Sequence, residues 1–179
     1  MAPVESPLLT PWANFYVMTG SSAAALTGLM FVVITLVPRF RLRRDPEGVA
    51  TFSTPTVAHF CSALFISAVL GAPWSLPTHA AVPIGICGLV GFIYVIRVMA
   101  RTRRLREYVP DLEDWTWFMG LPLLAYAALL VSAIALAATP TKALFALAGS
   151  VVLLIFIGIR NAWDVVTYIA IKDEGPSQE

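Results

Sequence analysis

Residues 143–171 read ALFALAGSVVLLIFIGIRNAWDVVTYIAI, an apolar stretch long enough to cross a lipid bilayer. The stretch nevertheless contains Arg160, Asn161 and Asp164. A charged side chain inside a transmembrane helix is costly unless it is paired, hydrated or close to the lipid headgroups. Arg160 and Asp164 are four residues apart, so a helix places them on one face within reach of each other. We therefore expect a membrane-spanning helix with a local ion pair, and any specific function of the protein close to that pair.

The composition of the whole chain indicates a membrane protein. Hydrophobic residues make up 58% of the chain and charged residues 13%, and the mean hydropathy is +0.78. A soluble domain carries about 25% charged residues. The charges here are clustered, which leaves further apolar runs of about 20 residues, the length that crosses a bilayer as a helix. We predict an all-α polytopic membrane protein, a single domain over residues 1–179 with spans at about residues 12–37, 55–74, 81–100, 115–138 and 142–171.

The distribution of arginine predicts the orientation in the membrane. Arginine clusters follow the first and third predicted spans, whereas the links after the second and fourth spans carry almost no charge. By the positive-inside rule, we expect the N-terminus to lie outside and the C-terminus to lie in the cytoplasm. The arginines that would contact anionic lipid headgroups are Arg39, Arg41, Arg43, Arg44, Arg101, Arg103, Arg104 and Arg106.

Small residues recur within two of the predicted spans. The first span contains Gly20, Ala24 and Gly28, and the third contains Gly85, Gly88 and Gly91. In lipid, small residues let a second helix approach closely. We expect these positions to pack helices within the subunit or between subunits of a homo-oligomer; the alternative is a backbone lining for a pore or ligand.

Six polar side chains fall at a similar depth near the predicted cytoplasmic ends of the spans. A rise of 1.5 Å per residue places Arg160 only about 4–5 Å inside the hydrocarbon boundary, a depth from which its side chain can reach the interface. One interpretation is an interfacial layer that contains a local ion pair. The other is a convergent site for an ion, a proton or an anionic headgroup, which the two apolar turns after Asp164 favour. The six residues are His59, Arg97, Asp114, Arg160, Asn161 and Asp164.

The chain lacks the usual residue patterns of catalysis and metal binding. His59 and His79 fall on opposite sides of the membrane in this topology, and Cys61 and Cys87 lie at different depths, so neither pair forms one site. No HExxH motif, Gly-rich phosphate loop or Ser/His/Asp set occurs at one depth. The net charge of +1 gives no general attraction to nucleic acid. We therefore predict no enzyme activity, no cofactor, no metal and no nucleic-acid partner.

The first predicted span resembles a known group of sequences. WANFYVMTGSSAAALTGLMFVVITL, residues 12–36, is similar to the first helix of small uncharacterised bacterial inner-membrane proteins, some of which are labelled modulators of a membrane-bound protease. The resemblance implies a bacterial inner-membrane location. It covers this one helix and transfers no functional residues.

Two functions are consistent with these features. The first is a non-catalytic accessory or scaffold protein that acts through helix packing against other membrane proteins. It predicts a local Arg160–Asp164 pair and a wholly apolar bundle interior. The second is a small oligomeric channel or transporter whose cytoplasmic vestibule is the six-residue polar layer. It predicts a continuous wet path that reaches these groups.

Overall fold

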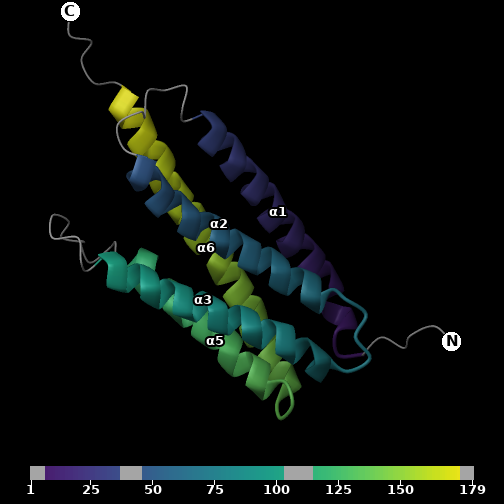
Figure 1. Ribbon diagram of the computed structural model, residues 1–179. Helices are drawn as coiled ribbons and strands as arrows, with labels where there is room; N and C mark the ends of the chain where they lie inside the picture. Colours follow the sequence, from purple (N-terminus) through teal and green to yellow (C-terminus); the bar gives the residue numbers. More distant parts are fainter. Residues whose placement is uncertain (1–6, 37–45, 103–114, 174–179) are drawn as a thin grey trace, which may run out of the picture.

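The protein is a bundle of helices (Figure 1). The computed structural model describes residues 7–36, 46–102 and 115–173, and no strand occurs among them. The predicted all-α fold class is therefore confirmed. The elements are η1 (Thr10–Trp12), α1 (Ala13–Leu36), α2 (Pro46–Leu70), η3 (Pro77–Ala80), α3 (Ala81–Thr102), the π-helical turn η4 (Thr116–Gly120), α5 (Leu121–Ala135) and α6 (Pro140–Asp173).

Within the described residues, four segments are long and apolar enough to cross a membrane. They are Thr10–Val33, Pro77–Ala100, Thr116–Ala135 and Pro140–Asp164. The apolar part of α2, Pro55–Leu70, is shorter. These helices support the prediction of a membrane protein, because apolar faces that point outward are stable in lipid but not in water.

Two prolines set helix geometry in different ways. The second span was expected to begin at Pro55 and to end near residue 74, but α2 begins at Pro46, continues through Pro55 and ends at Leu70. Proline removes one backbone donor, which an otherwise well-packed helix tolerates. Pro122, in contrast, lies at the start of a helix: α5 begins at Leu121, directly after the π-helical turn.

The spatial order of the helices differs from their order in the chain. α1 packs on α2, α2 packs on α6, α6 packs on α5, and α5 packs on α3. α6 therefore occupies the centre of the bundle, where Figure 1 shows it behind α2. The start of α1 and the end of α6 lie at opposite ends of the molecule (Figure 1).

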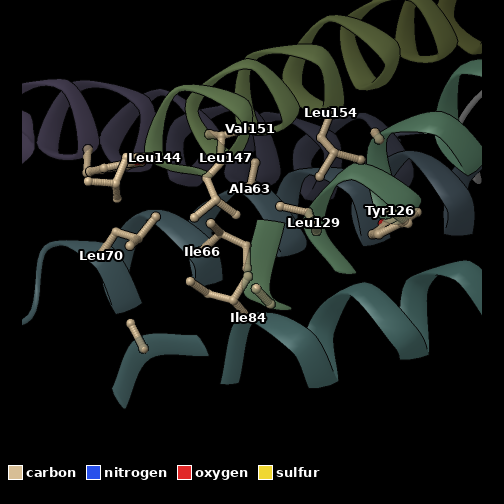
Figure 2. Packing of buried hydrophobic residues seen from close by; sticks show 14 of the residues in the cluster. Ala63, Ile66, Leu70, Ile84, Tyr126, Leu129, Leu144, Leu147, Val151 and Leu154 are labelled. Carbon is tan, nitrogen blue, oxygen red and sulfur yellow. The ribbon is translucent and has the colours of Figure 1, made fainter. Parts of the chain in front are cut away.

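The core lies where α2, α5 and α6 meet (Figure 2). α6 contributes Leu147, Val151 and Leu154, whose spacing of four and three residues keeps them on one face. Figure 2 shows this row above Ile66 of α2 and Leu129 of α5. All five side chains are fully buried, so they form an apolar contact among these three helices.

Glycine allows ring contact at one point of the α2–α6 interface. A Cβ atom at Gly158 would lie 2.4 Å from Cε1 of Phe60, well inside van der Waals contact. The backbone of α6 therefore lies directly against the Phe60 ring. A Cβ at Gly149, on the same helix, would meet no atom of a neighbouring helix within 4 Å.

The expected packing stripe on α1 divides between two faces. Gly20 faces α2, where a Cβ would lie 3.1 Å from Cβ of Ser67, and Thr19 Oγ1 lies 3.0 Å from Ser67 Oγ. Ala24 and Gly28 are exposed instead, and nothing lies within 4 Å of a Cβ at Gly28. A spacing of four residues advances by slightly more than one helical turn, so a long row rotates away from one neighbour.

Candidate functional site

A hydrogen-bonded group of polar side chains crosses the interior of the bundle. His59 of α2 has its Nδ1 atom 3.0 Å from the hydroxyl of Tyr126 on α5, and Ser62 Oγ lies 3.0 Å from the same hydroxyl. His59 is 1% exposed and Tyr126 is 0% exposed. We call His59, Ser62 and Tyr126 the α2–α5 bridge. It joins two helices that are not primary packing neighbours.

The directions of the hydrogen bonds determine the tautomer of His59. Ser62 Oγ also lies 2.8 Å from the carbonyl oxygen of Ala58, and a carbonyl can only accept. Ser62 therefore donates to Ala58, and Tyr126 must donate its one proton to Ser62. His59 then donates to the Tyr126 oxygen, so its proton is on Nδ1 and Nε2 is an acceptor.

Gly91 of α3 makes room for the ring of Tyr126. A Cβ atom at Gly91 would lie 2.1 Å from Cε1 and 2.2 Å from Cδ1 of Tyr126. The ring therefore lies against the backbone of α3 while its hydroxyl reaches α2. Gly88 and Gly85 face α5 along the same interface: a Cβ at Gly88 would meet Leu130 N at 3.0 Å, and one at Gly85 would meet Ala133 Cβ at 3.6 Å. All three glycines thus contribute to α3–α5 packing.

The polar residues of α6 lie in two different environments. Arg160 donates to Asp164 in an ion pair within one turn, and about a third of each side chain is exposed (33% and 34%). Asn161 is 0% exposed, and neither its Nδ2 nor its Oδ1 atom has a hydrogen-bond partner. The pair therefore lies at the surface of the bundle, and the neighbouring amide lies in its interior.

The described members of the six-residue polar layer have different surroundings. His59 bonds to Tyr126, Asn161 is buried, and Arg97 is exposed on α3. Asp114 lies outside the described residues. Depth along the helix was predictable from the rise per residue, but the direction in which each side chain points depends on the packing of neighbouring helices. The structure describes no side chain among the arginines that are predicted to contact lipid headgroups. Arg101 lies in α3, and the others lie outside the described residues: Arg39, Arg41, Arg43, Arg44, Arg103, Arg104 and Arg106.

A small hollow lies at the opposite end of the bundle, between the start of α1 and the link after α2. Its volume is about 60 Å³, and its walls include Leu9, Ala13, Leu70 and Trp74. Trp74 does not offer its indole N–H to a ligand there, because Nε1 donates to the carbonyl of Val69 at 2.6 Å. The hollow is therefore a packing feature of this end.

The described residues contain no side-chain group that could hold a metal ion. Cys61 and Cys87 are free thiols, and no group of three or more His, Cys, Asp or Glu side chains occurs within the described ranges. The bridge can hold His59 in one tautomer, and the Asn161 amide can both donate and accept. The arrangement is suited to hydrogen bonding inside the bundle.

Tyr126 and Ser62 are not among the residues that the sequence predicts for a site. Their signal was indirect: one tyrosine and one serine stand in the middle of apolar helices, and a glycine is available in a third helix. A mid-membrane tyrosine hydroxyl needs a partner, which would have drawn attention to His59 and Ser62.

Comparison with known proteins gives no family for this chain. No protein-family model matches it, and the comparisons with curated proteins and with solved structures found no match either.

Proposed function

We propose that the chain is a five-span protein of a bacterial inner membrane, with its N-terminus outside and its C-terminus in the cytoplasm. Four segments of sufficient length and hydropathy, the shorter apolar segment Pro55–Leu70, and the opposite positions of the start of α1 and the end of α6 support five crossings (Figure 1). The two arginine clusters support the orientation, since both fall on the side that the positive-inside rule assigns to the cytoplasm.

Cysteine labelling of intact cells tests this orientation. In a variant without Cys61 and Cys87, Ser75→Cys should react with a membrane-impermeant maleimide added outside, because Ser75 is exposed in the link between α2 and α3. A cysteine introduced within residues 39–44 should react only after the cells are opened. The reverse pattern would contradict the proposed orientation.

We further propose that the protein acts as a non-catalytic accessory subunit through helix packing, with a second copy of the chain as the first partner. The observation that carries this proposal is the outward face of α1, defined here as Ser21, Ala25 and Gly28. All three residues are exposed, and α1 packs within the subunit chiefly on α2, through its opposite face. Small side chains on a lipid-facing helix allow another helix to approach closely, which is the main source of helix association in a bilayer.

The local geometry favours this function over a channel. Arg160 is paired within α6, as the accessory function requires. The interior is not wholly apolar, because His59, Tyr126 and Asn161 are buried there, which corrects the expectation of a purely apolar core. His59 and Tyr126 bond to each other, so they hold helices together.

Disulfide crosslinking of single-cysteine variants tests the packing surface. In the same cysteine-free background, Ala25→Cys should form a crosslinked dimer in native membranes, because equivalent residues meet near the axis of a symmetric helix pair. Adding Gly28→Leu should abolish the crosslink by filling the close-approach surface. Val131→Cys is the matched control, since Val131 is 65% exposed on α5, away from α1. Equal crosslinking at both positions, or none with Ala25→Cys, would contradict self-association through α1.

A further inference from the structure

The amide of Asn161 points into the bundle without a partner. On α6, Val151, Leu154 and Ile157 form a fully buried face with helical spacing, and Asn161 continues this face by one turn. Its side chain is 0% exposed, and both Nδ2 and Oδ1 lack a hydrogen-bond partner. Ser150, buried on the same helix, behaves differently, because its hydroxyl donates to the carbonyl of Ala146 at 2.8 Å. The Asn161 side chain makes no such hydrogen bond within α6.

The π-helical turn η4 contributes a second group without a helical partner. The N–H of Leu121 donates to the carbonyl of Thr116, five residues earlier. The next residue, Pro122, has no N–H to donate. The carbonyl of Trp117 therefore lacks both usual helical donors, because the N–H of Leu121 donates to Thr116 instead and Pro122 has no N–H. η4 packs against α6, the helix that carries Asn161.

We propose that Asn161 and the π-helical turn form an intramembrane binding site for a small uncharged molecule that both donates and accepts hydrogen bonds, of which water is the smallest. The amide offers N–H donors and an oxygen acceptor side by side, and the Trp117 carbonyl adds a second acceptor. Arg160 and Asp164, on the same turn of α6, are partly exposed, so the site adjoins the polar end of the bundle.

The hydrogen-bond donors and acceptors of Asn161 and Trp117 determine which class of ligand fits the proposed site. A metal cation would bind the two oxygens but would face the N–H groups of Nδ2, and an anion would face the Trp117 carbonyl. An uncharged molecule with both functions satisfies all the groups at once. This site is independent of the packing function proposed for α1, because it lies on the inward faces of α6 and η4.

X-ray hydroxyl-radical footprinting of the full-length protein in nanodiscs tests the proposal with water as the probe. Radicals form from water at the site and oxidise sulfur atoms close to it. Met119 is the buried side chain of η4 and Met30 is a similarly buried residue of α1, at 5% and 3% exposure. Met119 should be oxidised clearly faster than Met30 in the wild type. In Asn161→Leu, which replaces the amide by an apolar group of similar size, the rate at Met119 should fall to that of Met30.

Ser150→Ala is the matched control, because it removes a buried polar group of α6 that already has a local partner. It should leave the rate at Met119 unchanged. Equal oxidation of Met119 and Met30 in the wild type would overturn the proposal without any variant, so the test stands even if Asn161→Leu fails to fold. Fast oxidation of Met119 that persists in folded Asn161→Leu would overturn it as well, because the water would not depend on the amide.

Discussion

Replacing Gly91 by alanine is expected to destabilise the protein more than any other glycine-to-alanine change in α3. The new Cβ atom would lie 2.1 Å from Cε1 of Tyr126. The ring cannot move aside freely, because its hydroxyl is bonded to both His59 and Ser62. Forcing one extra carbon into such a packed interior costs about 1–3 kcal/mol. The measurement is the melting temperature in detergent, followed by intrinsic tryptophan fluorescence.

Gly85→Ala is the matched control for this change. Gly85 lies in the same helix and faces the same neighbour, but its added Cβ would lie 3.6 Å from Cβ of Ala133, an ordinary contact. Alanine also has the higher helix propensity, by about 0.8–1 kcal/mol. Gly85→Ala should therefore melt at the wild-type temperature or above it. If Gly91→Ala also melts there, the Tyr126 ring does not lie against α3 as described.

Tyr126→Phe should lower the melting temperature although the substitution removes one oxygen atom. Without the hydroxyl, the Nδ1–H of His59 loses its acceptor and Ser62 loses its donor. A buried polar group left without a partner costs about 1–3 kcal/mol, and hydrocarbon around the bundle offers no replacement. The aromatic ring is kept, so the decrease in melting temperature measures the hydrogen bonds of the α2–α5 bridge and not apolar packing.

Tyr16→Phe provides the comparison. Tyr16 is 1% exposed on α1, and its hydroxyl is buried without a partner. Removing that hydroxyl relieves an unsatisfied group, so Tyr16→Phe should melt at or above the wild-type temperature. Equal losses in the two variants would show that the hydrogen bonds of the bridge do not account for the effect of Tyr126→Phe.

The fold class followed from the sequence because lipid imposes one dominant rule. A chain in hydrocarbon must satisfy its backbone hydrogen bonds internally, so each long apolar run becomes a helix. The start of α2 was less predictable. The sequence predicts Pro55 as a first helical residue, a position that suits proline, but the helix extends back to Pro46. A proline signals either a start or a tolerated interruption, and packing decides between them.

The candidate site was only partly predictable. The sequence indicated the Arg160–Asp164 pair, because a spacing of four residues makes that contact local to one helix. The bonds of His59 depend on α5, which is far from α2 in the chain, and on the space left by Gly91 in α3. No local pattern contains that information. Residues at equal depth were therefore grouped with Arg160, whereas the structure pairs His59 with Tyr126.

The central place of α6 has a consequence for biosynthesis. α6 contacts α1, α2, α5 and the π-helical turn, yet the ribosome makes it after all of them. The earlier helices must therefore wait in the bilayer with their future contact surfaces covered only by lipid or by the insertion machinery. Native assembly of these helices therefore requires α6 to leave the translocon, and a nascent chain stalled before α6 has no central helix on which to assemble.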